Sequence, residues 1–211
     1  MGGLPLNQRT WEEHLIMTQP NQSAPQDHTP SNLPVTVSIV VPAYNEASVL
    51  AAFHSRLRLA LSPLTTETFE VIYIDDGSTD TSFARLKNIQ AQDPSVGIAR
   101  LSRNVGKESA LSAGLELAKG QAVIVIDADL QDPPELIPDM VHAWRHGADV
   151  VNMRRKSREG ESALKKLTAR MFYRAMNWLS DVPIMQDVGD FRLLSRRAVD
   201  TLNAMPERCR F

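Results

Sequence analysis

The sequence contains little that would cross-link it or anchor it. Its 211 residues include one cysteine, Cys209, which excludes an internal disulfide and is typical of a reducing compartment. No run reaches the roughly 18 consecutive apolar residues of a membrane span, and the first 33 residues lack the apolar core of a signal peptide. The formal net charge of −2 offers no basic field for nucleic acid. We therefore expect a chain that is soluble as given and binds no nucleic acid.

The two common glycine-rich nucleotide motifs are also absent. There is no G-x-G-x-x-G fingerprint, and Gly106-Lys107 does not end a P-loop, because Leu101 stands where the first glycine of that motif would be. Histidine and cysteine form no cluster that would favour zinc. The sequence therefore predicts no P-loop, no dinucleotide-binding fingerprint and no zinc site.

Short apolar runs alternate with helical patterns from residue 35 onward. Strands are expected at 35–41, 69–74, 96–101, 122–126, 149–151 and 191–194. Helices are expected over 47–61, around 83–89 with Ser78 or Thr79 as cap, over 111–118, after Pro133-Pro134, over 162–179 and from 196. This alternation predicts an α/β fold with a Rossmann-like, mostly parallel sheet and helices on both faces.

The chain divides into a leader and one domain. Residues 1–34 carry five prolines and no apolar core, and we expect a mostly disordered leader with a short helix over Thr10–Met17. Residues 35–211 form the α/β domain. The sequence stops shortly after a helical pattern without a polar tail, so we interpret it as a fragment of a longer protein. A native terminus is the alternative.

Acidic residues follow two of the expected strands. Asp75-Asp76 comes after the second strand, and Asp127-Ala-Asp129 after the fourth. Because ligands of open parallel sheets bind beyond the carboxyl ends of the strands, we expect the two clusters to converge. The alternative for Asp76 is ordinary turn chemistry and a helix cap. With Gln131, the second cluster offers oxygen ligands at alternate positions, which suit Mg²⁺ or Mn²⁺ and could place a metal on a nucleoside diphosphate.

Other groups fall at the same edge of the predicted sheet. Pro42, Tyr44 and Glu46 end the first strand and combine an aromatic face with an acceptor for a base or ribose. After the third strand, Arg103 and Lys107 supply cations where phosphates would lie. These residues predict a nucleotide site.

A basic stretch and a late acidic turn complete the candidates. Residues 152–174 hold eight Lys or Arg against two acids, and the helix expected over 162–179 is amphipathic, which predicts contact with an anionic membrane surface. A solvated helix face is the alternative. Arg155 or Arg158 could bind a phosphate oxygen. Asp190 lies in the turn before the last strand, where Gly189 permits close backbone approach.

Five motifs occur in order and together resemble a known family. They are VVPAYNE at 40–46, IDDGSTD at 74–80, RNVGK at 103–107, DADLQDPPE at 127–135 and GDFRL at 189–193. They are similar to family 2 glycosyltransferases of the GT-A fold, and within it to the polyprenyl-phosphate sugar transferases (the dolichyl-phosphate mannose synthase and bactoprenol glucosyl transferase group). The resemblance covers about 35 to 211.

The resemblance implies roles for individual residues. The nucleotide sugar would contact Pro42, Tyr44, Glu46, Asp76, Lys107, Asp127 and Gln131. Asp127, Asp129 and Gln131 would hold Mg²⁺ or Mn²⁺, and Arg155, Arg158 and Arg192 would bind phosphate. Asp190 matches the proposed acceptor-side catalytic carboxylate, with Asp129 and Arg155 as its catalytic partners. Relatives usually continue into amphipathic and transmembrane helices, and this chain lacks such a region.

The function implied is inverting transfer of a sugar from a nucleoside diphosphate to a polyprenyl phosphate. UDP-sugars are favoured, GDP-mannose also fits, and the expected location is the cytoplasmic face of a bacterial inner membrane, with a homo-oligomer possible. An alternative within the fold is transfer to a saccharide or other acceptor. Two alternatives belong to other protein classes. One is a metal-dependent aspartate phosphatase, whose motif belongs on the first strand, and the other is a receiver-type signalling domain, which would be shorter.

Overall fold

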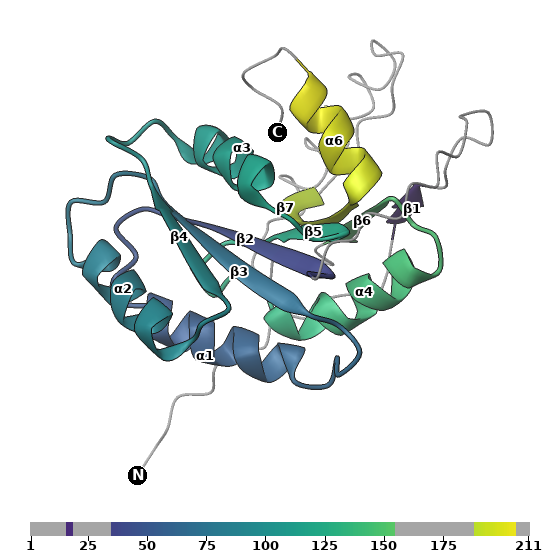
Figure 1. Cartoon of the computed structure of the whole chain (residues 1–211), viewed down its shortest axis with the longest axis horizontal. Helices are drawn as coiled ribbons and strands as arrows, with labels where there is room; N and C mark the ends of the chain where they lie inside the picture. Colours follow the sequence, from purple (N-terminus) through teal and green to yellow (C-terminus); the bar gives the residue numbers. More distant parts are fainter. Residues whose placement is uncertain (1–15, 19–34, 155–187, 206–211) are drawn as a thin grey trace, which may run out of the picture.

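A computed structural model describes residues 16–18, 35–154 and 188–205 (Figure 1). Its strands are β1 Ile16–Thr18, β2 Val37–Ala43, β3 Phe69–Asp75, β4 Val96–Arg100, β5 Ala122–Val125, β6 Val150–Arg154 and β7 Val188–Ser195. The helices are α1 Leu50–Leu61, α2 Ser82–Gln92, α3 Lys107–Leu117, α4 Ile137–Arg145 and α6 Arg196–Ala204, with a 3₁₀ turn η1 at Pro134–Leu136. Strand and helix alternate from β2 to α4, as the apolar pattern predicts.

One sheet of seven strands organises the domain, in the order β1-β6-β7-β5-β2-β3-β4. β2 pairs in parallel with both β3 and β5, and β3 pairs in parallel with β4. β7 is antiparallel to β5 and to β6, so β6 runs in the same direction as β2 to β5. The mostly parallel sheet expected from the sequence is confirmed, with β7 and β1 running the other way.

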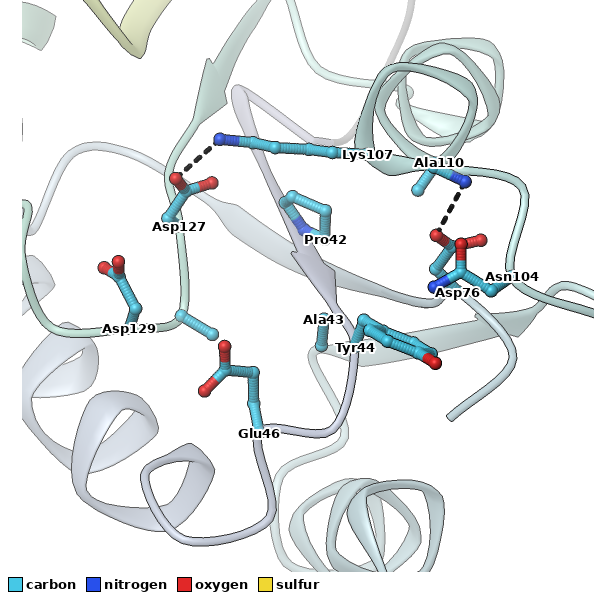
Figure 2. A pocket seen from close by; sticks show the side chains of 12 residues that line it. Pro42, Ala43, Tyr44, Glu46, Asp76, Asn104, Lys107, Ala110, Asp127 and Asp129 are labelled. Carbon is cyan, nitrogen blue, oxygen red and sulfur yellow. Dashed lines mark hydrogen bonds and ion pairs between the residues drawn. The ribbon is translucent and has the colours of Figure 1, made fainter. Parts of the chain in front are cut away.

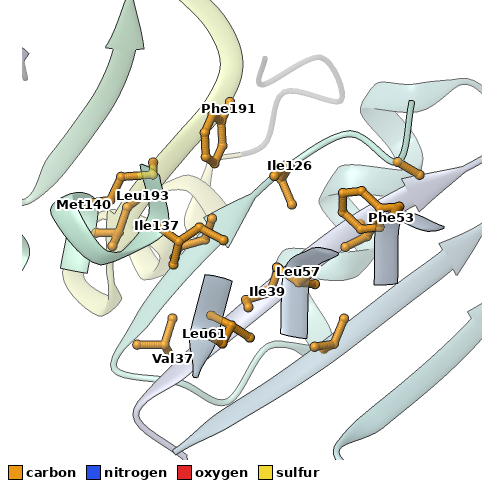
Figure 3. Close-up of a cluster of buried hydrophobic side chains, with 14 of the residues drawn as sticks. Val37, Ile39, Phe53, Leu57, Leu61, Ile126, Ile137, Met140, Phe191 and Leu193 are labelled. Atoms are coloured by element: carbon orange, nitrogen blue, oxygen red, sulfur yellow. The ribbon is translucent and has the colours of Figure 1, made fainter. Parts of the chain in front are cut away.

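Side chains of the central strands alternate between two apolar cores. On β2, Ile39 and Val41 lie in the larger core with α1, α2 and α4, whereas Val40 lies in the smaller core with α3 and α6. Figure 1 shows these two groups of helices on opposite faces of the sheet, and Figure 3 shows how side chains of α1, α4 and β7 fill the larger core. Burial on both faces explains why these strands read as continuous apolar runs.

Two local predictions are wrong. Ile16 and Met17 do not end a helix but lie in β1, which pairs antiparallel with β6. An isolated helix of eight residues is marginal in water, whereas the edge of β6 offers backbone partners. Helix α2 is not capped by Ser78 or Thr79: its N-cap is Thr81, and the Asp80 carboxylate accepts the Ser82 N–H at 2.9 Å.

Some predictions fall outside the described residues. They are Arg155, Arg158, the basic helix over 162–179 and residues 206–211. Of the helices in the described part of the chain, none combines the length and the apolar character needed to cross a bilayer.

Candidate nucleotide and sugar-transfer site

A pocket opens where β2, β3 and β5 end, at the strand from which the sheet order runs in both directions (Figure 2). Its volume is about 250 Å³. It is lined by Pro42, Ala43, Tyr44, Glu46, Asp76, Asn104, Gly106, Lys107, Ala110, Asp127, Ala128 and Asp129. The expected convergence of Asp76 with Asp127 and Asp129 is therefore confirmed, and it takes place where open α/β sheets bind ligands.

Hydrogen bonds connect the turn after β2 to the segment after β3. Asn45 adopts a positive φ of 55°, a conformation in which asparagine is enriched. Its Oδ1 accepts the Thr79 N–H at 2.9 Å, and the Glu46 N–H donates to Ser82 Oγ at 2.8 Å. The two segments are therefore held together, and Tyr44 lines the pocket and is 42% exposed.

Asp76 holds the loop that leads into α3. The carboxylate is buried, and its two oxygens accept the backbone N–H groups of Val105 at 2.8 Å and Gly106 at 3.0 Å. Gly77 follows with φ 68°, and a Cβ there would collide with the Arg103 carbonyl carbon and lie 2.6 Å from the Asn104 nitrogen. Asp76 and Gly77 thus fix the position from which Lys107 extends.

Asp75 has a different environment from its neighbour. It is fully buried, its Oδ2 lies 2.9 Å from Arg100 Nε, and its Oδ1 accepts the Ser78 N–H at 3.2 Å. The Arg100 guanidinium also lies over the Phe83 ring, 4.5 Å from its centroid. Asp75 is not among the lining residues. Of the first acidic pair, only Asp76 therefore faces the site.

The second acidic cluster is held by an unusual backbone. Asp129 Oδ1 accepts the Gln131 N–H at 2.9 Å, and the residue between them, Leu130, has φ 62°. A bulky residue in this region is strained, and such strain collects at functional sites. The Leu130 side chain packs against the larger core, which stabilises the turn. Gln131 is exposed and does not line the cavity, so its role as a ligand stays a prediction.

Lys107 joins the two sides of the site. Its Nζ lies 2.6 Å from Asp127 Oδ2 and 2.7 Å from Asp190 Oδ2, and Asp190 Oδ1 lies 3.4 Å from Arg192. Burial acts to raise the pKa of Asp190, but the Lys107 hydrogen bond and the charges of Lys107 and Arg192 outweigh it, and the pKa is lowered. Burial likewise acts to lower the pKa of Lys107, but its bonds to Asp127 and Asp190 leave it raised. The lysine is an ammonium ion between two carboxylates.

The acidic groups repel one another across the pocket. The pKa of Glu46 is raised by burial first, and then by the charges of Asp129, Asp127 and Asp80. Within the described residues, no three His, Cys, Asp or Glu side chains are grouped as they would be around a metal ion. Asp127 and Asp129 nevertheless provide two hard oxygen donors in a region of excess negative charge, a donor set that fits Mg²⁺ or Mn²⁺.

Most of the predicted site residues that the structure describes come together. Those that line the pocket are Pro42, Tyr44, Glu46, Asp76, Lys107, Asp127 and Asp129. Asp190 joins them through Lys107, and Arg192 through Asp190. Sequence reasoning assigned no role to Asn45, Asn104 or Leu130. For Asn45 a signal existed, because asparagine is enriched among residues in the left-handed conformation.

Two comparisons of sequence match this chain to glycosyltransferases. The family model "Glycosyl transferase family 2" matches residues 38–202. An uncharacterised glycosyltransferase of Synechocystis is 46% identical over 177 residues, which cover 84% of this chain and 55% of that protein. A prophage bactoprenol glucosyl transferase homolog of Escherichia coli is 41% identical over 172 residues, covering 82% and 56%. The chain spans just over half the length of these relatives.

A solved structure shares the fold. Glucosyl-3-phosphoglycerate synthase from Mycobacterium tuberculosis, in complex with Mn²⁺, UDP and phosphoglyceric acid, superposes with a TM-score of 0.53 at 25% identity. The match covers 78% of this chain and 57% of that one. The GT-A architecture expected from the motifs is thereby confirmed.

Proposed function

Since the chain belongs to glycosyl transferase family 2, we propose that it transfers a sugar from a nucleoside diphosphate to a polyprenyl phosphate at the cytoplasmic face of a membrane. The observation that carries the proposal is the single pocket that gathers Asp76, Lys107, Asp127 and Asp129 at the ends of three parallel strands. Neither a phosphatase nor a receiver domain accounts for the family match over residues 38–202.

The pocket offers groups for both the base and the diphosphate of the proposed donor. The exposed Tyr44 ring offers a face for the base, and Glu46 offers an acceptor for base or ribose hydroxyls. The N-terminal end of α3 and the Lys107 ammonium attract the diphosphate, because a helix N-terminus carries partial positive charge. Asp127 and Asp129 would hold a divalent cation, which when bound stabilises the negative charge that develops on the leaving diphosphate.

The reaction is an inverting displacement at the anomeric carbon. An oxygen of the acceptor phosphate attacks this carbon as the bond to the nucleoside diphosphate breaks, and the diphosphate leaves with the bonding electrons. A phosphate monoester with a second pKa near 6 is largely dianionic at neutral pH, so no proton has to be removed from it. Asp190, whose pKa is lowered, is a weak base, which supports a role in orienting the acceptor or sugar.

The acceptor is inferred from relatives and from charge. Several relatives that are 41% identical carry the name bactoprenol glucosyl transferase, which favours a polyprenyl phosphate and a UDP-sugar here. The basic residues of 154–174 suit an anionic membrane surface, with Arg155 and Arg158 as phosphate ligands. The phosphoglyceric acid bound by the structural neighbour makes a small phosphate ester the second candidate acceptor.

Calorimetric titration of the full chain with UDP and with GDP, each with Mn²⁺ or with chelator, tests the donor site. We expect UDP to bind only with Mn²⁺. The acceptor is then tested by incubation with UDP-glucose and either undecaprenyl phosphate in detergent or 3-phosphoglycerate. Transfer to the lipid supports the proposal, and transfer to phosphoglycerate alone replaces the lipid acceptor. A folded chain that binds neither nucleotide with Mn²⁺ contradicts the donor assignment.

A further inference from the structure

Lys107 occupies a position that the donor chemistry alone does not explain. Its ammonium is shared between Asp127, which follows β5, and Asp190 on β7, which are 20 and 83 residues away in the sequence. An ammonium has three N–H donors and no fixed plane, so it can bridge two carboxylates. Among the described residues, this is the contact that links the proposed donor side to the proposed acceptor side.

The contact of the Lys107 ammonium with Asp127 and Asp190 can be broken easily. The side chains of Lys107 and Asp190 are each 40% exposed and that of Asp127 is 29% exposed, and ion pairs that solvent reaches are weak. The lysine stem is flexible, whereas its backbone is fixed, because the preceding Gly106 N–H is held by Asp76. The ammonium can therefore exchange partners without movement of α3.

Lys107 and a divalent cation compete for the same oxygen. Nζ lies 2.6 Å from Asp127 Oδ2, and a bound Mg²⁺ needs its oxygens at roughly 2.1 Å in near-octahedral geometry. Two positive charges on one carboxylate repel each other, most strongly on the same oxygen, so a cation on Asp127 weakens the hold of this carboxylate on the ammonium. The second partner, Asp190 Oδ2, is already 2.7 Å from Nζ.

We propose that Lys107 is a built-in counter-cation that Asp127 and Asp190 share until the divalent cation binds to Asp127, and that the ammonium is then transferred wholly to Asp190, which it already contacts. The inference rests on the proposed function, because it takes Asp127 as a ligand of the donor-side metal. Lys107 is in this view a positioning residue for Asp190: arrival of the metal and donor strengthens the Lys107–Asp190 pair. The acceptor-side carboxylate, which Lys107 and Arg192 already contact, would then be held more firmly when the donor side is loaded.

Direct Mn²⁺ binding to the full chain without nucleotide, measured by electron paramagnetic resonance, tests the competition. In Lys107→Met the competitor is gone, and we expect Mn²⁺ to bind at least about fivefold more tightly than in the unchanged protein. The matched control is Lys119→Met, which removes the same charge from an exposed residue that does not line the pocket, and its affinity should stay within twofold. If Lys107→Met fails to fold, Lys107→Gln takes its place. Equal or weaker Mn²⁺ binding by the Lys107 variant overturns the inference.

A double-mutant cycle tests the transfer. The shift in denaturation midpoint is measured for Lys107→Met, Asp190→Asn and the double variant, with and without saturating Mg²⁺. We expect the coupling between the two residues to grow when Mg²⁺ is present, and a coupling that falls rules out the transfer. Failure of the proposed function is seen separately, as absence of Mn²⁺-dependent UDP binding in the unchanged protein. The Mn²⁺ affinities without nucleotide can be compared in either case.

Discussion

At the scale of the residue, the carboxylates near the pocket differ by their partners. Asp76 accepts a backbone N–H on each of its two oxygens, which makes it a support for the loop before α3. Asp127 and Asp190 share one ammonium. Asp129 receives one backbone N–H and raises the pKa of Glu46. Asp127 and Asp129 are therefore the carboxylates best placed to receive added positive charge.

This difference predicts unequal effects of removing charge. Asp127→Asn or Asp129→Asn removes a proposed metal ligand and should lower turnover by about 100-fold or more, the usual loss for a group that stabilises charge in a transition state. Asp190→Asn keeps the shape and removes only an orienting charge, and we expect a loss of roughly tenfold or less. Steady-state assays with UDP-sugar and acceptor compare the three variants. Similar losses in all three variants would count against a purely orienting role for Asp190.

At the scale of the element, α3 is fixed against the sheet by a small residue. A Cβ on Gly114 would collide with Val40 Cγ1 of β2 and lie 3.3 Å from Ile74 Cγ1 of β3. Overpacking of this kind costs roughly 1–3 kcal/mol. Because α3 also carries Lys107, its displacement would move the ammonium as well.

Gly114→Ala should therefore lower the free energy of unfolding by about 1–3 kcal/mol and weaken nucleotide binding. The control is Gly97→Ala on β4, where a new Cβ would lie 4.0 Å from the Val71 carbonyl oxygen, an ordinary contact. That variant should be neutral or slightly stabilising. Urea denaturation of both variants makes the comparison. Equal stability of the two would show that α3 can shift at no cost.

A second inter-element contact predicts pH dependence. His54 of α1 lies 3.0 Å from the Tyr73 hydroxyl of β3 and 3.3 Å from Asp93 after α2. Burial lowers the pKa of His54 below its ordinary value of 6.5, and the partly opposing charge of Asp93 does not restore it. The unfolded chain therefore binds the proton more readily than the folded one. Stability is complete above pH 6.5 and falls as the pH drops below it.

Denaturation of the unchanged protein between pH 7 and 5 should show this fall, with a slope of up to about 1.4 kcal/mol per pH unit. His54→Gln cannot take up the proton, so its stability should change less over the same range. Between pH 7.5 and 8.5 the histidine is neutral in both states, and the difference between the two proteins should be constant. Parallel curves from pH 7 down to 5 would contradict the assignment to His54.

The sequence predicts the central elements well because they are buried on both sides. Val37 to Val41 and Ala122 to Ile126 read as apolar runs for this reason, and the acids that follow β3 and β5 could be placed at one edge. Other features depend on contacts distant in sequence. Asp76 accepts the N–H groups of Val105 and Gly106, and Asp75 pairs with Arg100 instead of facing the pocket. Neither arrangement leaves a local sequence pattern, so neither could be predicted.

At the scale of the whole molecule, the topology creates the site. β2 has β3 on one side and β5 on the other, and β7 lies antiparallel beside β5. This pairing carries Asp190 to the Lys107 ammonium. The alternation of strands and helices predicts the parallel strands, whereas nothing in the short apolar run 191–194 indicates that β7 is antiparallel. The meeting of Asp190 with Lys107 was therefore beyond sequence reasoning.

A site shared by several strands and α3 links ligand binding to global stability. A ligand that binds only the folded chain stabilises it by mass action, by about 2.7 kcal/mol at a concentration 100 times its dissociation constant. For a domain of this size that corresponds to a rise in Tm of roughly 5–11 °C. We expect this rise with UDP and Mn²⁺ together, and a much smaller one with UDP and chelator. Asp127→Asn should abolish it and Lys119→Met should retain it. An equal rise with chelator would mean that nucleotide binding does not require the metal, and Asp127 would then have to act through Lys107 alone.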